Sequence, residues 1–198
     1  LVSGLIGIYT VGGATPDFSN FTAAAAALHA GGVVGAVTFN VRNGTYSEQI
    51  SLNQILGADS VKTVTFQSEA GDSSLVILTF ASTLSTANYT LRLNGTDWLR
   101  VRKMTVRATG ATYARVVDLG SLAHENIFEN NLLQSVSTTS TSNTRVIFYS
   151  SGFRDTANVI CQNRFLNGAD GIQIFGGSTS SLETETVVED NTFVNQYR

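Results

Sequence analysis

Four charged residues in the second half of the chain could take part in acid–base chemistry: Lys103, Glu129, Arg164 and Asp190. Two carboxylates can act as a proton donor and as a base or nucleophile, while a nearby cationic side chain stabilises a developing negative charge. The separation between Glu129 and Asp190 decides which reactions such a pair could carry out. That separation depends on how the segments that carry the two residues stack, and therefore on the fold.

The segments that carry Glu129, Arg164 and Asp190 are copies of one short pattern. The sequences IFENNLLQ (127–134), ICQNRFLN (160–167) and VEDNTFVN (188–195) align without gaps, and each has an asparagine between two apolar positions. Weaker copies occur earlier in the chain, and the irregular spacing of all the copies indicates coils that tolerate insertions. The three shared asparagines are Asn130, Asn163 and Asn191, and the weaker copies lie at 34–41, 61–68 and 101–108.

Short strands that recur with the same corner residue predict an all-β chain folded as a right-handed parallel β-helix. Successive coils of such a solenoid stack about 4.8 Å apart. We therefore expect Asn130, Asn163 and Asn191 to form a hydrogen-bonded ladder, since asparagine tolerates the left-handed backbone of a tight corner. A β-sandwich or a propeller fragment is the alternative, but neither explains an asparagine at the same place in each copy.

The predicted stacking makes a surface role for the charged residues more favoured than a catalytic one. Glu129 and Asp190 would lie two coils apart, about 9.6 Å. This exceeds the ~5–5.5 Å of a retaining glycosidase and reaches only the outer edge of the inverting range. A calcium site would need more carboxylates than this column offers. The same alignment places Lys103 beside Glu129, where the two would form an exposed ion pair.

Residues 17–30, DFSNFTAAAAALHA, form the one helix that the sequence predicts. Asp17 or Ser19 can cap its first turn, and the run of alanines favours a helix. Phe21 and Leu28 lie on one apolar stripe of this helix. A solenoid exposes its core at the first coil unless a cap covers it, so we expect these two side chains to plug that end.

The composition is typical of a secreted or cell-surface protein. Only 14% of the 198 residues are charged and the formal net charge is −3, so no nucleic-acid partner is expected. No apolar run is long enough to span a membrane, and neither the single cysteine nor the two isolated histidines indicate a metal or another cofactor. We predict one β-helix domain over 1–198, with a capping helix at 17–30, coils over 34–198, and covalent continuation into further domains.

The region from Asp17 to Leu52 resembles a known group of proteins. Its successive segments DFSNFTAAAAAL, VTFNV and NGTYSEQISL are similar to the capping helix, first strand and first corner of pectinesterase-like and pectate-lyase-like right-handed β-helix proteins. The lead-in IGIYTVGGATPDFSNF also resembles repeat modules of large secreted proteins of environmental Gram-negative bacteria. The resemblance implies carbohydrate chemistry. Pectinesterases carry Gln-Asp-Thr and Asp-Phe-x-Phe-Gly segments; the first is missing here, and in IQIFGG (172–177) Ile172 stands where the second has its aspartate.

The sequence therefore favours a non-catalytic β-helical module of a secreted or surface protein, acting as a stalk or adhesin with a polysaccharide or surface glycan as its ligand. Trp98, between Asp97 and Arg100, is the aromatic residue we would first expect to stack on a sugar. The alternative is a polysaccharide lyase or carbohydrate esterase that acts on an acidic polysaccharide through Glu129 and its charged neighbours. Calcium would be a cofactor only for the lyase.

Overall fold

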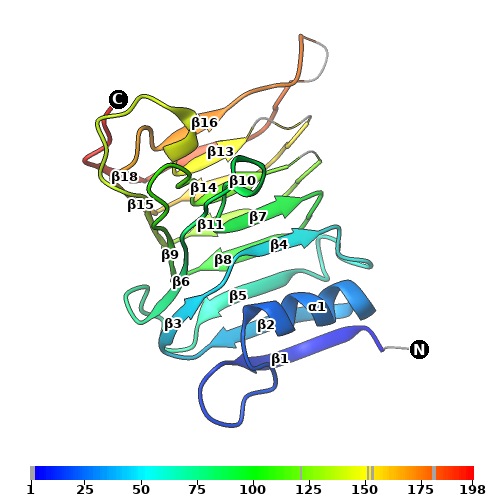
Figure 1. The fold of residues 1–198 in the computed structure, drawn as a ribbon. Coiled ribbons are helices and arrows are strands. Elements are labelled where there is room, and N and C mark those ends of the chain that lie inside the picture. Colours follow the sequence, from blue (N-terminus) through cyan, green and yellow to red (C-terminus); the bar gives the residue numbers. More distant parts are fainter. Residues whose placement is uncertain (1–2, 121, 151, 153, 180–181) are drawn as a thin grey trace.

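The computed structural model describes residues 3–120, 122–150, 152, 154–179 and 182–198, and within these residues every paired strand runs parallel to its neighbours. The strands form three sheets, each built from one strand of successive coils, so the chain winds as a β-solenoid (Figure 1). The prediction of a parallel β-helix is confirmed. The N-terminus lies at one end of the stack and the last coil at the other (Figure 1).

The sheets are named here A, B and C, in the order in which a coil passes through them. Sheet A contains β1 (Leu5–Val11), β2 (Val33–Val41), β5 (Val64–Ser68), β8 (Leu99–Arg102), β11 (Ile127–Glu129), β14 (Val159–Cys161) and β17 (Val187–Glu189). Sheet B contains β3 (Gly44–Ser47), β6 (Val76–Phe80), β9 (Thr105–Ala108), β12 (Leu132–Gln134), β15 (Arg164–Leu166) and β18 (Thr192–Val194). Sheet C contains β4 (Ile50–Asn53), β7 (Leu91–Asn94), β10 (Val117–Leu119), β13 (Phe148–Ser150) and β16 (Ile172–Ile174). Two short 3-10 helices, η1 (Ser85–Ala87) and η2 (Asn143–Arg145), lie between sheets B and C.

The core fills the space between the three sheets, because alternate residues of each strand point inward. Equivalent inward positions on successive coils carry similar side chains, which stack directly on one another. Phe39 on β2 stacks on Phe66 of β5 with 4.5 Å between ring centroids, and Phe165 on β15 stacks on Phe193 of β18 at 4.8 Å. The period-2 apolar pattern thus becomes continuous columns along the axis.

The helix α1 (Phe21–Gly31) packs against β1 and β4 at the N-terminal end of the solenoid (Figure 1). It begins four residues later than predicted, because Asn20 is the cap: its Oδ1 accepts a hydrogen bond from the backbone N–H of Ala23 at 2.9 Å. The carboxylate of Asp17 instead accepts from the N–H and hydroxyl of Thr10. Phe21 and Leu28 are both buried, and the Phe21 ring stacks on Phe66.

An asparagine ladder does run along the corner between sheets A and B, but the predicted register is wrong by one residue in its first copy. The ladder consists of Asn131, Asn163 and Asn191. Asn131 Nδ2 donates to Asn163 Oδ1 at 3.0 Å, and Asn163 Nδ2 donates to Asn191 Oδ1 at 3.1 Å. Asn130 is exposed and its Nδ2 donates to Gln162 Oε1 instead.

The alignment error has a simple physical cause. We matched Ile127 with Ile160 because both are aliphatic, whereas the structure pairs Ile160 with Phe128, and it is Phe128 that points into the core. The left-handed position of the corner is therefore the residue before the ladder asparagine. It is occupied by Lys103, Asn130, Gln162 and Asp190, with φ angles of 52°, 55°, 57° and 53°.

Candidate functional site

The structure does not bring Lys103, Glu129, Arg164 and Asp190 together. Lys103 and Asp190 share the exposed left-handed column, but they are three coils apart, about 14 Å at the stacking distance. Glu129 ends β11, and its carboxylate pairs with Arg102 on the coil below, so the predicted pairing with Lys103 is wrong. Arg164 is exposed at the start of β15.

Two further residues from the sequence analysis lie elsewhere. Trp98 is half-buried at the corner between sheets C and A and has a φ of 58°. Its backbone N–H donates to the backbone carbonyl of His124. Its role in sugar stacking stays a prediction. Ile172, which stands where pectinesterases have an aspartate, begins β16 beside Phe148 and packs against the core.

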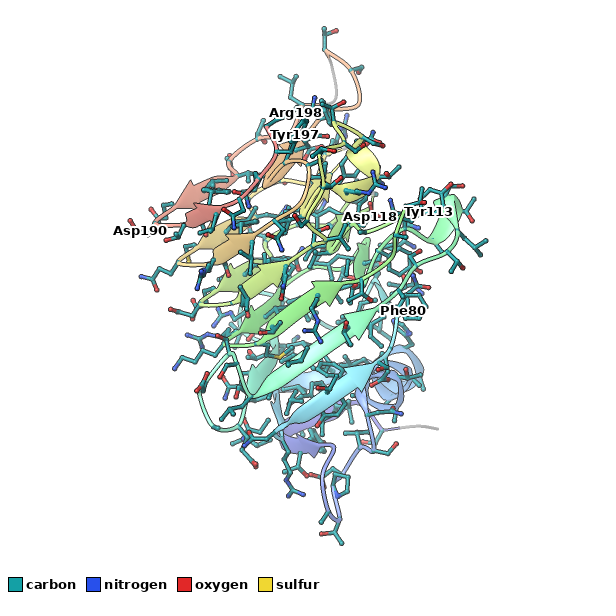
Figure 2. The ribbon with its side chains drawn as sticks, turned by 60° about the vertical axis from the view of Figure 1, so that its left-hand side comes forward. Phe80, Tyr113, Asp118, Asp190, Tyr197 and Arg198 are labelled. Atoms are coloured by element: carbon teal, nitrogen blue, oxygen red, sulfur yellow. The ribbon has the colours of Figure 1, made fainter. Side chains whose placement is uncertain are left out.

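The charged side chains that the structure does bring together project from the outer face of sheet C. Arg92 on β7, Asp118 on β10 and Tyr149 on β13 are register partners on successive coils. Each follows an inward apolar residue of its strand, so strand alternation turns the polar group outward. Figure 2 shows Asp118 on the side of the solenoid away from Asp190.

Asp118 lies between two guanidinium groups. Its Oδ2 is 3.4 Å from Arg92 Nε, and its Oδ1 is 3.2 Å from Arg115 Nη1. The guanidinium of Arg115 also stacks on the ring of Tyr149, 3.4 Å from the centroid. The side chain of Asp118 is only 13% exposed, and Arg92 Nε is buried without a hydrogen-bond partner among the described residues.

Neighbouring corner segments fix the position of Arg115 from behind. Its backbone N–H donates to Asn88 Oδ1 at 3.0 Å, and its Nε donates to the carbonyl of Asn143 at 3.0 Å. Asn88 is itself buried and donates to the carbonyl of Thr144. Segments that are far apart in sequence thus hold the arginine in one orientation, which lowers the entropic cost of binding a ligand there.

Asn88, Arg92, Arg115 and Asp118 line a cleft of about 230 Å³. One wall is the corner segment 85–89, where Tyr89 lies with its ring centroid 5.7 Å from the guanidinium carbon of Arg92. Gly120 and Gly152 also line the cleft and offer no side chain there. We call this the arginine cleft, meaning the space around Arg92, Arg115 and Asp118.

Burial has the largest effect on Asp118 and raises the pKa of its carboxyl group above the ordinary value. The charges of Arg115 and Arg92 lower this pKa, and the charge of Asp155 raises it. With both arginines charged and Asp118 ionised, the three groups sum to 2 − 1 = +1. Guanidinium groups present several N–H donors in a plane and bind carboxylates in a bidentate manner. The arginine cleft is therefore suited to an anionic group of a ligand that lies next to the ring of Tyr89.

Asp118 is the only carboxyl group among the described residues that line the arginine cleft. Asp155 lies nearby but faces the interior: its Oδ1 accepts from the N–H of Ala123 at 2.9 Å, and its Oδ2 accepts from the hydroxyl of Ser150 at 2.7 Å. Within the described ranges, no group of three or more His, Cys, Asp or Glu residues is arranged to hold a metal ion. The same residues include no helix long and apolar enough to cross a membrane.

The sequence does contain a signal for this cleft. In the runs YTLRLNG (89–95) and ARVVDLG (114–120), Arg92 and Asp118 each stand between two aliphatic residues of a strand. An isolated charge at the outward position of a strand predicts a polar surface column. The alignment of the asparagine-containing copies does not reveal this signal, because those copies cover the corner between sheets A and B and do not include sheet C.

No family model matches the sequence, and no curated protein matches it. Solved structures do share its fold. The chain is similar to pectin methylesterase PemA from Erwinia chrysanthemi, with a TM-score of 0.65 and 12% identity over 97% of this chain and 56% of that one. It is also similar to the pectin methylesterase of Aspergillus niger, with a TM-score of 0.61 and 16% identity over 98% of this chain and 68% of that one. The chain spans little more than half the length of the Erwinia enzyme.

A third similar structure is a pectin methylesterase variant in complex with a hexasaccharide, with a TM-score of 0.54 and 10% identity over 94% of this chain and 65% of that one. The low identities establish the fold alone. The parallel sheets, the stacked coils and these structural neighbours together confirm the expected resemblance. The chain has the pectin lyase-like parallel β-helix fold.

Proposed function

We propose that this chain is a carbohydrate-binding β-helical module, which holds an anionic polysaccharide in the arginine cleft without cleaving it. The observation that carries the proposal is the placement of Arg92 and Arg115 on either side of one carboxylate, Asp118, in a cleft with a net charge of +1. A stalk or adhesin role in a secreted or surface-attached protein with further domains is part of the same proposal. It is supported by the low charge of the chain and by structural neighbours that are pectin methylesterases.

The lack of turnover follows from the number of carboxyl groups in the arginine cleft. Hydrolysis by paired carboxylates needs a second group to donate or accept the proton. Asp118 is the only such group among the described lining residues, and both oxygens of Asp155 are engaged in the interior. The site is therefore better suited to holding a sugar acid than to transforming it.

A carbohydrate esterase is the second candidate, favoured by the position of Asp118 between two guanidinium groups. The carboxylate of Asp118 would attack the carbonyl carbon of a methyl ester, and the departing methoxide would take a proton from a water molecule and leave as methanol. The hydroxide that remains would hydrolyse the acyl-enzyme to the free sugar acid and restore the carboxylate. The pectin methylesterase neighbours make this the reaction to test first.

The test measures binding and turnover with the same preparations. Calorimetry with polygalacturonate should detect binding, and Arg92→Ala or Arg115→Ala should weaken it at least about 10-fold, as expected for a lost charge-assisted contact. Arg107→Ala, a half-buried arginine on β9 of sheet B, is the matched control and should bind normally.

Turnover is followed as methanol released from methyl-esterified pectin, and as unsaturated product with and without calcium. No product is expected from either assay. Methanol release that disappears in Asp118→Asn would establish the esterase instead. Unsaturated product that disappears in Glu129→Ala would establish the lyase.

A further inference from the structure

A second groove, larger than the arginine cleft, lies where the strands of sheet C end. It has a volume of about 520 Å³ and is lined by Asn53, Gln54, Asn94, Asp97, Leu122 and His124, together with Gly95. Asn53 and Asn94 are the last residues of β4 and β7. We call this space the amide groove.

The polar groups of the amide groove are held in defined orientations. Asn94 Nδ2 donates to Asn53 Oδ1 at 3.0 Å, so the two carboxamides form a rigid pair. Asp97 Oδ1 accepts from the N–H of His124 at 2.9 Å, and its second oxygen accepts no hydrogen bond from the described residues. The backbone N–H of Thr156 donates to His124 Nδ1 at 3.2 Å, which fixes the orientation of the imidazole ring. The amide groove thus combines a carboxylate that accepts hydrogen bonds with carboxamide N–H groups that donate them, all in fixed orientations.

Leu122 supplies the apolar component. Its side chain is 52% exposed, and its backbone has a φ of 63°. A bulky apolar residue is uncommon in the left-handed region, and such conformations concentrate at functional sites. Paired amides and a carboxylate beside an exposed aliphatic surface suit a ring that has hydroxyl groups on its edge and C–H groups on its face.

The arginine cleft and the amide groove are neighbours along β7, because Arg92 lines the first and Asn94 lines the second. Arg92 and Asn94 both point outward from this strand, two residues or about 6.6 Å apart. Gly120 follows β10 on the next coil, beside Asn94, and lines the arginine cleft; a Cβ at this position would lie 3.0 Å from Asn94 Oδ1. The lack of a side chain at residue 120 therefore leaves the surface beside Asn94 clear on the side of the arginine cleft.

The two spaces differ in charge. The arginine cleft sums to +1, as shown above, whereas the only formal charge among the lining residues of the amide groove is that of Asp97, because His124 is counted neutral. A sugar carboxylate that bound beside Asp97 would be repelled by a like charge. An uncharged sugar would not be repelled by Asp97 and could form hydrogen bonds with the polar side chains of the amide groove.

We propose that the arginine cleft and the amide groove are consecutive subsites for a heteropolysaccharide in which an anionic sugar is followed by a neutral one. The anionic sugar occupies the arginine cleft and the neutral sugar occupies the amide groove. This inference rests on the proposed function. It adds the order of sugars in the ligand, in which anionic and neutral sugars alternate.

The experiment compares three oligosaccharides of equal length by calorimetry: one that alternates glucuronate with N-acetylglucosamine, one composed of uronate alone, and one uncharged. The alternating probe should bind at least about 10-fold more tightly than either of the others. Asn94→Ala and Leu122→Ala should weaken only the alternating and uncharged probes. Leu75→Ala, an exposed leucine beyond β5, is the matched control.

Asp97→Asn provides the sharpest variant, since asparagine keeps the oxygen that accepts from His124 and removes the charge. It should improve binding of the all-uronate probe several-fold and leave the alternating probe nearly unchanged. Equal or tighter binding of the all-uronate probe to the unaltered chain would overturn the inference while leaving the proposed function intact. Failure of every anionic probe to bind, or normal binding by Arg92→Ala, would overturn the proposed function itself.

Discussion

The two ends of the solenoid use the same inward positions in different ways. At the N-terminal end, Phe39 is fully buried between the rings of Tyr9, Phe18 and Phe66, under the cover of β1 and α1. In the last described coil, Val188 and Phe193 occupy inward positions of β17 and β18 but remain 46% and 49% exposed. An inward position becomes core only when both of its sides are covered, so identical sequence patterns contribute different stabilities at the two ends.

The largest expected difference comes from removing one ring at each end. Phe39→Ala should lower the free energy of unfolding by about 3–5 kcal/mol, because it leaves a cavity in packed surroundings. Phe193→Ala should cost about 1 kcal/mol or less, since half of the ring already faces solvent. Urea titrations followed by circular dichroism measure both values. Equal losses would mean that the last coil is covered in solution.

The asparagine ladder gives a smaller test of the same contrast. Asn131 is buried, accepts from the N–H of Met104 and donates to the carbonyl of Val101, besides its contact with Asn163. Asn131→Ala should therefore cost about 1–3 kcal/mol, as unsatisfied buried groups do, and Asn191→Ala less. Asn130→Gly, which suits the left-handed backbone, is the control and should change the midpoint of denaturation little. A larger effect at residue 130 than at 131 would restore the register predicted from sequence.

The smallest expected effect is on pH dependence, which should have opposite sign at the two ends. Burial, then the charge of Asp155, raises the pKa of Glu183 to about 7, although N–H groups of Asp155 and Arg154 oppose the shift. The folded state therefore holds this proton more tightly than the unfolded state. The resulting stabilisation is complete below the unfolded value near 4.5 and disappears as the pH rises through about 7. At the N-terminal end, hydrogen bonds from Thr10 lower the pKa of Asp17, so its contribution is lost as the pH falls.

Amide exchange at pH 5 and pH 8.5 measures this difference coil by coil. Protection around β17 should decrease at the higher pH, and Glu183→Gln should remove that change while leaving β2 unaffected. Protection around β17 that increases with pH would contradict the assignment.

Sequence reasoning succeeded where the signal is local or repeated. Alternating apolar residues, recurrent asparagines and the alanine-rich helix were sufficient for the fold. The register failed by one residue at Asn130, because Ile127 and Phe128 are both apolar and only core packing decides which one faces inward. The arginine cleft could be predicted only in part, because the isolated charges at 92 and 118 indicate an outward polar column, whereas Arg115 owes its position to Asn88 and Asn143, which are brought to it by the lengths of irregular corners.

Pairwise stacking also governs how this molecule would respond to force. Among the described residues, most contacts of a strand are with the strands directly before and after it within its sheet. Pulling along the axis would therefore load one interface between turns at a time. The stretched chain would lengthen in steps of one turn, so it could absorb mechanical work over many successive ruptures.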